Sequence, residues 1–205
     1  MSSVKSVVIG VVASVLLVGC SNDPSVQADS GPVAPVTSTP ANRTGRMQIG
    51  PTPPPPSTLS APATDLPPPE VYTPTVAIDD VRIEVDADTG IERVVYLFAG
   101  TGIPFFRAGY VAEAVPHRGG PSLAVTGQAI MQVDIMGTAT PARNLFFVAP
   151  PLAGPEGARV TQLYLLPDTR DVNGITQSFI GLRSGPRPFE VVTVEDPPQL
   201  IIEIR

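Results

Sequence analysis

The sequence predicts an all-β protein, a single antiparallel β-sandwich that follows an export signal and a proline-rich linker. Three observations support this fold class. From Val76 onward, short runs of alternating apolar and polar residues recur between turn-forming residues, a pattern typical of half-buried strands. No window of ten or more residues there has a 3.6-residue apolar period without proline or glycine, so no long helix is expected. Fourteen of the 26 prolines lie between Pro24 and Pro74, which separates this stretch from the predicted domain.

The first 19 residues have the layout of a secretory signal peptide. Lys5 precedes an apolar run of about a dozen residues, whereas a membrane-spanning helix needs about twenty. The run ends in Leu17-Val18-Gly19-Cys20, which contains the only cysteine of the chain and resembles the lipobox of bacterial lipoproteins. The resemblance implies cleavage before Cys20, acylation of its thiol, and a lipid anchor on the extracytoplasmic face of the cell membrane. An uncleaved short anchor is the alternative.

Residues 20–75 are predicted to be the lipidated N-terminus followed by a disordered linker. The stretch contains Pro53-Pro54-Pro55-Pro56 and no aromatic residue before Tyr72, so it has too little apolar surface to offset the entropy cost of ordering. Where it is extended as polyproline, at about 3.1 Å per residue, it would hold a domain on the order of 100 Å from the membrane. A ligand for a proline-binding domain is the alternative, and a spacer is favoured.

Three predicted strands alternate most cleanly: Val81–Val85, Ala129–Ile135 and Leu200–Ile204. Further strands with weaker alternation, the last of them short, are predicted at Arg93–Phe98, Phe105–Val111, Val160–Leu166, Gln177–Leu182, Phe189–Val194 and Leu145–Val148. Many short strands separated by turns indicate an antiparallel sandwich or barrel.

The segments between these strands carry turn chemistry. Asp86–Gly90 predicts a turn in which the final glycine takes a positive φ. Asp168–Gly174 ends in Asn-Gly, a strong hairpin signal. Ala112–Val115 predicts one helical turn, which the following proline ends. Gly137–Ala158 is rich in proline, alanine and glycine and predicts a long excursion between strands.

Composition argues against several functions. The formal net charge is −6, which disfavours binding to nucleic acid. Lys5 is the only lysine and belongs to the predicted signal, so the mature chain has no side-chain amine for a Schiff base. With Cys20 acylated, no thiol remains for disulfides or metal ligation. We therefore expect no cofactor and no nucleic-acid partner.

The sequence also suggests no assembled catalytic or metal site. His117 is the only histidine and no G-x-S-x-G motif is present, while a zinc site needs three or four ligands. Asp86-x-Asp88 resembles the start of a calcium loop, but Leu97 occupies the twelfth position, where calcium loops carry an acidic residue. Asp168 and Asp171 are conceivable as a carboxylate pair for glycan cleavage, although their setting is typical of a solvated turn. The protein is predicted not to be an enzyme.

The order of several segments resembles a known family. These segments are Ile91–Gly100, Phe106–Val111, Met131–Ile135, Ile180–Arg183, Pro188–Val191 and Asp196–Ile204. Together they are similar to the AMIN-like domain of actinobacterial lipoproteins and secreted proteins, which is itself related to the AMIN domain found beside cell-wall amidases and secretin pores. The resemblance covers residues 76–205. It implies a β-sandwich and a non-catalytic module that targets its carrier to the cell envelope, with peptidoglycan as the suggested ligand.

Four residues are candidates for contacting such a ligand: Arg107, Tyr110, Arg183 and Arg187. Arginines would pair with the carboxylates of peptidoglycan stem peptides, and an exposed aromatic ring would contact sugars. Arg107 and Tyr110 are three residues apart and would leave a strand on opposite faces, unless a bulge intervenes. The alternative is that Phe189 is a core residue and the arginines near it serve solubility.

The expected function is therefore that of a lipid-anchored envelope protein that binds peptidoglycan. Two other roles stay open at this point. One is an accessory protein that binds another envelope protein through a sheet edge or its loops, and the other is a carrier of a small apolar ligand.

Overall fold

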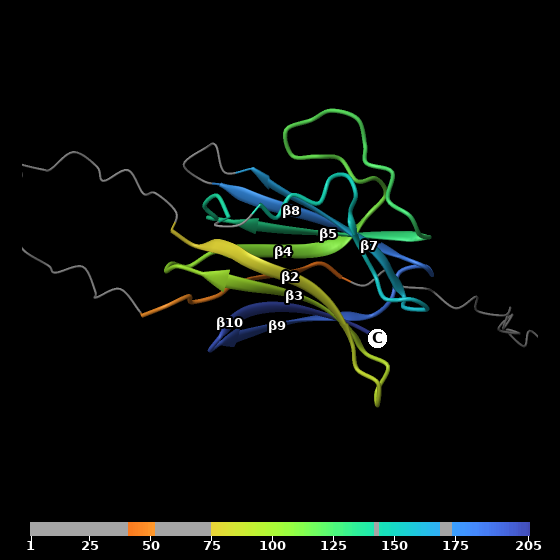
Figure 1. Cartoon of the computed structure of the whole chain (residues 1–205), viewed down its shortest axis with the longest axis horizontal. Helices are drawn as coiled ribbons and strands as arrows, with labels where there is room; N and C mark the ends of the chain where they lie inside the picture. The colour runs from red at the N-terminus through yellow and green to blue at the C-terminus, as the bar shows by residue number, and fades with distance from the viewer. Residues whose placement is uncertain (1–40, 52–74, 142–143, 169–173) are drawn as a thin grey trace, which may run out of the picture. The chain divides into compact units, whose positions relative to one another are not determined.

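The computed structural model describes residues 41–51, 75–141, 144–168 and 174–205. These residues form ten strands and no helix, and two antiparallel sheets pack face to face (Figure 1). The predicted fold class, an all-β sandwich, is confirmed. The predicted signal peptide and Cys20 lie outside the described residues. The described residues contain no apolar helix of membrane-spanning length.

The larger sheet has six strands in the order β1-β4-β5-β8-β7-β6. Their bounds are β1 Arg43–Arg46, β4 Phe105–Val111, β5 Ala129–Met136, β8 Ile175–Leu182, β7 Val160–Asp168 and β6 Leu152–Ala153. The smaller sheet has four strands in the order β2-β3-β10-β9. Their bounds are β2 Ala77–Val85, β3 Glu92–Ala99, β10 Pro198–Ile204 and β9 Phe189–Glu195. All pairings are antiparallel.

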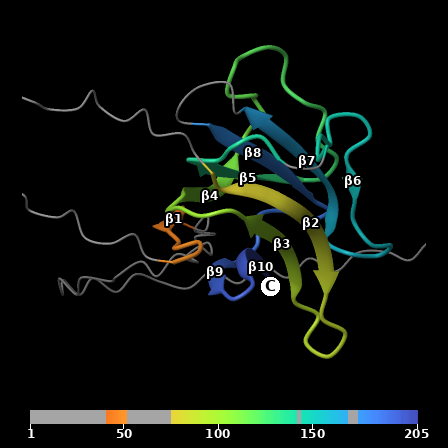
Figure 2. The same cartoon turned by 60° about the vertical axis from the view of Figure 1, so that its left-hand side comes forward.

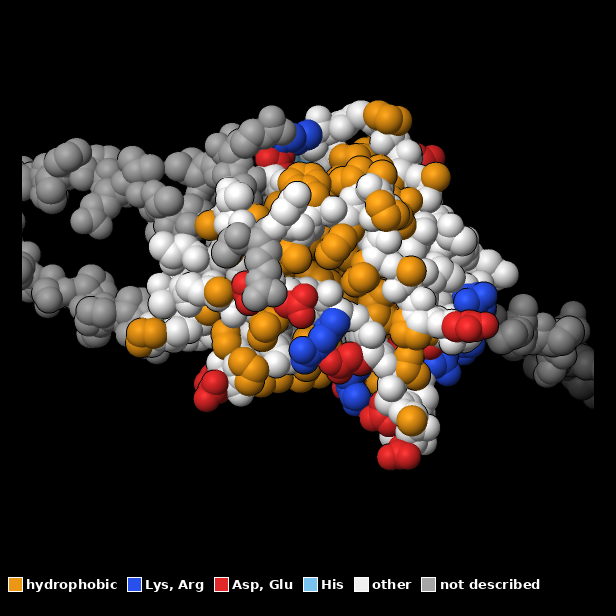
Figure 3. Space-filling model, viewed as in Figure 1, with side chains coloured by type: hydrophobic (Ala, Val, Ile, Leu, Met, Phe, Trp, Pro, Cys, Tyr) orange, Lys and Arg blue, Asp and Glu red, His pale blue; other side chains and the backbone are white. Residues whose placement is uncertain are grey.

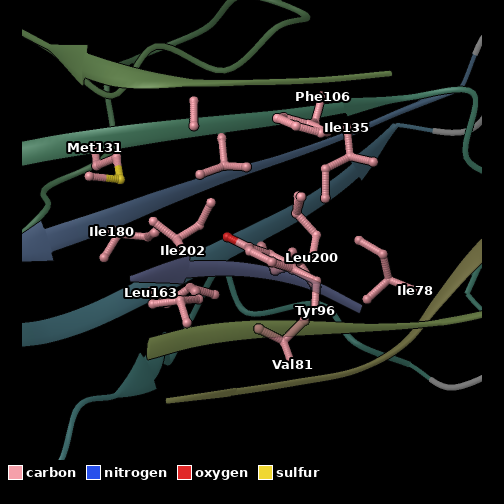
Figure 4. Packing of buried hydrophobic residues seen from close by; sticks show 14 of the residues in the cluster. Ile78, Val81, Tyr96, Phe106, Met131, Ile135, Leu163, Ile180, Leu200 and Ile202 are labelled. Atoms are coloured by element: carbon pink, nitrogen blue, oxygen red, sulfur yellow. The ribbon is translucent and has the colours of Figure 1, made fainter. Parts of the chain in front are cut away.

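Side chains from both sheets fill one core between the layers. Figure 4 shows Tyr96 of β3 and Leu200 and Ile202 of β10 facing Phe106, Met131 and Ile180 of the six-stranded sheet. The Tyr96 hydroxyl lies 2.6 Å from Ser178 Oγ on β8, so the one polar group on this ring has a partner across the sandwich. Most of the other buried members are apolar side chains at alternate strand positions, as the period-two pattern predicts.

Eight of the predicted strands are present, and the ninth is wrong. Residues 145–148 form no strand, although Leu145 is buried and Phe147 packs against the core. The apolar residues at positions 145 and 147 mimic a strand pattern because both side chains face the core from a loop. The loop is joined to β7 by a hydrogen bond from the Phe147 amide to the Leu165 carbonyl at 3.3 Å. The short edge strand is instead β6, which pairs with β7 at Leu163 and Gln162. The rest of the predicted excursion is irregular where it is described.

The predicted helical turn at Ala112–Val115 is also wrong. Ala114 forms an isolated bridge with Leu123, and its side chain is buried against Tyr164 and Phe179. Tyr164 and Phe179 face away from the main core, so the segment from 112 to 128 covers part of the outer face of the six-stranded sheet. Packing of Ala114 against these two aromatic rings therefore determines the local conformation, and it overrides the weak helix propensity of residues 112–115.

The predicted turn at Asp86–Gly90 is confirmed. Asp86 Oδ1 accepts hydrogen bonds from the amides of Asp88 and Thr89 at 3.1 and 3.0 Å, and Gly90 has φ +67°. The Thr89 amide is the main reason that the pKa of Asp86 lies below its ordinary value, with smaller contributions from the Thr89 hydroxyl and Arg93. Figure 3 shows acidic and basic side chains gathered around this hairpin, where Arg93 also pairs with Glu203 at 2.8 Å.

Strand β1 differs from the prediction that residues 20–75 are a linker. Arg43–Arg46 pairs with β4 (Figure 2), and Met47 and Ile49 are buried in the core. A four-residue strand with one glycine and two arginines has no apolar alternation, so no local pattern predicts a strand there. The folded unit thus includes residues 41–51, while residues 20–40 and 52–74 of the predicted linker lie outside the described residues.

Replacing Ile49 by alanine is expected to destabilise the domain by about 3 kcal/mol, the usual cost of truncating a fully buried aliphatic side chain. Gln48→Ala is the matched control, because Gln48 is the adjacent residue and its side chain bonds only to nearby backbone at the surface. Urea unfolding of the chain with Cys20 replaced by serine would measure both. Equal midpoints for the two variants would contradict the placement of residues 41–51 in the core.

Candidate ligand-binding site

A polar row crosses the outer face of the six-stranded sheet. Arg107 on β4 lies opposite Asp134 on β5, and Asp134 lies opposite Gln177 on β8. Cross-strand partners share a face, and the residues on either side of Asp134, Val133 and Ile135, face the core. The row is therefore on the side of the sheet that does not pack against the four-stranded sheet.

A buried carboxylate organises this row. Asp134 Oδ2 accepts a hydrogen bond from Arg107 Nη2 at 2.7 Å, and Gln132 Nε2 lies 2.9 Å from both oxygens of the same carboxylate. The Asp134 side chain is 8% exposed, whereas that of Arg107 is 56% exposed. The carboxylate thus fixes one end of the guanidinium and balances its charge, and the rest of the guanidinium faces solvent.

A cavity of about 190 Å³ opens beside Arg107. It is lined by Asn42, Arg107, Gly109, Tyr110, Val111 and Gln132. A Cβ atom at Gly109 would lie 2.0 Å from Asn42 Oδ1, so a larger residue there would displace the Asn42 side chain. Asn42 immediately precedes β1, so one wall of the cavity comes from the segment that the sequence placed in the linker.

Arg107 and Tyr110 both line this cavity although their side chains leave β4 on opposite faces. The pairing of β4 with β5 has no bulge, so successive side chains of β4 point to opposite faces of the sheet. The Tyr110 ring packs edge-on against Phe189, with centroids 5.8 Å apart at 81°. Its hydroxyl donates to the Arg187 carbonyl and accepts from the Arg187 amide, both at 2.9 Å. Burial raises the pKa of Tyr110.

The structure places the other two predicted arginines differently. Arg187 is exposed and adjoins Tyr110 through its backbone, while its Nε donates to Ser184 Oγ at 3.2 Å. Arg183 Nε donates to the carbonyl of Ala158, in the loop between β6 and β7, at 3.0 Å. Neither lines the cavity of Arg107. The alternative view of Phe189 is confirmed, because its side chain is buried in the core.

Three residues of this site were missed by sequence reasoning: Asn42, Gln132 and Asp134. A weak signal existed for Asp134, the only charged residue in a strand of otherwise apolar and amide side chains. No comparable signal marked Asn42, since its role depends on where β1 docks.

The only histidine lies at a second cavity, of about 180 Å³. His117 and the exposed Phe146 line it together with Pro116, Arg118, Leu166, Pro167, Asp168 and Gln177. The His117 amide donates to Gln177 Oε1 at 2.9 Å, and Arg118 forms an ion pair with Asp168. Asp171, the second member of the conceivable carboxylate pair, lies outside the described residues. Among those that are described, no group of three or more histidine, cysteine, aspartate or glutamate side chains is placed to hold a metal ion.

Comparison with known proteins gives one match. The family model of the AMIN-like domain matches residues 76–205, the range in which the sequence resembles that family. Searches of curated proteins and of solved structures each found no match. The matched range starts after β1 and contains the other nine strands. The chain therefore belongs to the AMIN-like domain family.

Proposed function

We propose that this protein is an extracytoplasmic lipoprotein, anchored through Cys20, whose AMIN-like domain binds peptidoglycan without catalysing a reaction. The single observation that carries the binding site is the cavity in which an exposed guanidinium and two side-chain amides meet over a buried carboxylate. Membership of the AMIN-like family supports the envelope location and the class of ligand. The lipid anchor rests on the lipobox-like sequence that ends at Cys20.

The chemistry of the cavity favours the neutral, polar parts of peptidoglycan. Asp134 balances the charge of Arg107, so a free carboxylate of the ligand would meet a guanidinium that is already paired. The amides of Asn42 and Gln132 carry both donors and acceptors, which suit hydroxyl and N-acetyl groups of the glycan strand. The cavity is smaller than the roughly 300 Å³ of a typical small-molecule pocket, so it would receive one sugar substituent and not a whole disaccharide.

Arg107→Ala is expected to weaken retention by peptidoglycan about tenfold, the effect of losing hydrogen bonds to a charged donor. Arg82→Ala is the matched control, because Arg82 has a similarly exposed side chain (49%) and pairs with Glu84 on the other sheet. The measurement is co-sedimentation of the Cys20→Ser chain with insoluble peptidoglycan, with urea unfolding to confirm that both variants are folded. Equal retention of the two variants would reject this cavity as the binding site.

The dependence on salt separates this cavity from the other predicted arginines. Because Arg107 and Asp134 carry no net charge together, retention through the cavity is expected to change little as salt is raised. Contact of Arg183 and Arg187 with stem-peptide carboxylates remains a prediction, and it would be lost between about 0.05 and 0.5 M salt as screening increases. The measurement compares peptidoglycan retention across this salt range for three proteins: wild type, Arg107→Ala and an Arg183→Ala/Arg187→Ala double variant. It separates the contribution of the cavity from that of the other two arginines.

A further inference from the structure

Strand β1 is held on the edge of β4 in the manner of a bound peptide. Its register runs from Arg43 opposite Ala108 to Arg46 opposite Phe105. The ladder continues beyond the strand, since the Met47 amide donates to the Pro104 carbonyl at 3.2 Å and Ile49 exchanges two 2.9 Å bonds with Gly102. Backbone hydrogen bonds of this kind supply affinity in strand addition, and alternate side chains supply specificity.

The alternate side chains of this segment fit defined places on the domain. Arg43 lies over the Phe189 ring at 5.9 Å, and Met47 and Ile49 are buried in the core. Between them, Gly45 faces Phe106 so closely that a Cβ atom would lie 2.5 Å from the ring. The edge of β4 therefore selects a residue pattern with glycine opposite Phe106 and apolar side chains two and four residues later.

The connection from this segment to β2 is much longer than its ends require. Gly50 packs against Thr101, with an ideal Cβ atom 2.6 Å from the Thr101 methyl group. The Thr75 hydroxyl donates to the carbonyl of the same Thr101 at 2.5 Å. Gly50 and Thr75 therefore both contact Thr101. The 24 residues between them, 51 to 74, would span roughly 80 Å if fully extended.

We propose that the edge of β4 is a strand-acceptor site and that residues 42–50 of a second copy of this chain occupy it, in a reciprocal exchange that forms a dimer. The contacts in the exchanged form are those seen within one chain, because the same residues meet the same edge. Each cavity beside Arg107 then receives Asn42 from the second copy. The inference does not depend on what the cavity binds.

The balance between the closed monomer and the exchanged dimer is set by concentration. Covalent linkage gives the chain's own segment an effective concentration in the millimolar range, so the monomer dominates in dilute solution. Exchange becomes favourable where copies are crowded to similar concentrations, and a connection of 24 residues is long enough to reach a neighbouring copy.

Engineered disulfides across the exchanged ladder would test the proposal. Thr44 and Arg107 are cross-strand partners with side chains on the outer face. Because Ile49 and Gly102 form a hydrogen-bonded pair, alternation makes Thr44 and Arg107 a non-hydrogen-bonded pair, whose side chains are closer. Thr44→Cys and Arg107→Cys are placed in separate full-length Cys20→Ser chains. The two chains are mixed at high concentration in mild urea, diluted, oxidised and separated without reductant.

The expected result is a disulfide-linked heterodimer several times more abundant than in a control mixture of Thr44→Cys with Arg82→Cys, where Arg82 is exposed on the other sheet. Adding Gly45→Val to the Thr44→Cys chain is expected to remove this excess, because the new side chain would collide with Phe106. The same chain carrying Gln48→Ala instead is expected to keep it. Cross-linking no higher than in the control mixture, alongside an intramolecular disulfide in the Thr44→Cys/Arg107→Cys double variant, would overturn the proposal. Peptidoglycan retention of the wild-type protein is measured separately, so a negative result for strand exchange does not bear on peptidoglycan binding, and the reverse also holds.

Discussion

Glu92→Ala is expected to lower the free energy of unfolding by about 4 kcal/mol, since it leaves buried donors without an acceptor. Glu92 lies at the start of β3, on the face that packs against the other sheet, and is 2% exposed. Its two oxygens accept the amides of Arg159 and Val160 at 2.6 and 2.7 Å. Arg159 Nη1 also reaches Glu92 Oε1 at 3.5 Å and the Gly90 carbonyl at 2.6 Å. One carboxylate thus ties the two sheets together at this end.

Two further variants make this prediction specific. Glu92→Gln keeps one acceptor oxygen and is expected to lose about half as much stability as the alanine variant. Glu84→Ala removes an exposed carboxylate that pairs with Arg82 and is expected to cost less than about 1 kcal/mol. Urea unfolding at neutral pH measures all three. A loss for Glu92→Ala no larger than that for Glu84→Ala would show that the contact between the sheets contributes little.

Tyr96→Ala is expected to destabilise the protein by about 4 kcal/mol, because it leaves a cavity the size of a ring at the centre of the core. Tyr96→Phe removes only the hydroxyl and is expected to cost about 1 kcal/mol. The cost is small because Ser178, the hydrogen-bond partner of Tyr96, keeps a second partner in the variant. Its hydroxyl also lies 3.4 Å from the Val133 carbonyl. Chemical unfolding of the two variants separates the contribution of ring packing from that of the hydrogen bond.

The same residue gives an expected loss of stability at alkaline pH. Burial raises the pKa of Tyr96 well above its ordinary value, and the hydrogen bond to Ser178 opposes this shift only in part. The folded state therefore keeps the proton that the unfolded state releases above about pH 10. Stability from this group is complete below that pH and falls by up to about 1.4 kcal/mol per pH unit above it. Comparing urea midpoints at about pH 8 and pH 11, we expect Tyr96→Phe to lose less stability than wild type. Parallel losses in both proteins would contradict this origin.

Local patterns in the sequence were sufficient to predict most of the strands. Alternation with a period of two depends on which side of a strand is buried, and residues such as Val81, Val133 and Ile202 report that directly. The turn at Asp86–Gly90 is equally local, because a side-chain oxygen and a positive φ create it within five residues. Neither prediction needs knowledge of how the strands pair.

The same local patterns fail where burial comes from a distant part of the chain. Leu145 and Phe147 alternate like strand residues but face the core from a loop. Ala114 lies in a sequence compatible with a helical turn, and its burial against Tyr164 and Phe179 imposes a bridge instead. In each case the side chain has the expected polarity, and the backbone follows contacts with residues far away in the sequence.

The candidate site shows the same division. Sequence reasoning selected Arg107 and Tyr110 by residue type, and the structure places both on the lining of one cavity. Asn42 and Asp134 became part of the site only through the pairing of β1 and β5 with β4. The carboxylate that balances Arg107 also changes the expected ligand chemistry from charged to neutral groups.

By itself, the sequence determined the all-β class, the positions of eight strands and the resemblance to the AMIN-like family, because these depend on residue type and on spacing along one strand. Only the tertiary structure decided that residues 41–51 join the fold, since four hydrogen-bonded residues with no apolar alternation become a strand only when an edge such as β4 offers partners. It likewise decided which polar side chains meet beside Arg107. Cross-strand register brings together residues that are distant in the sequence, and no local pattern encodes that register.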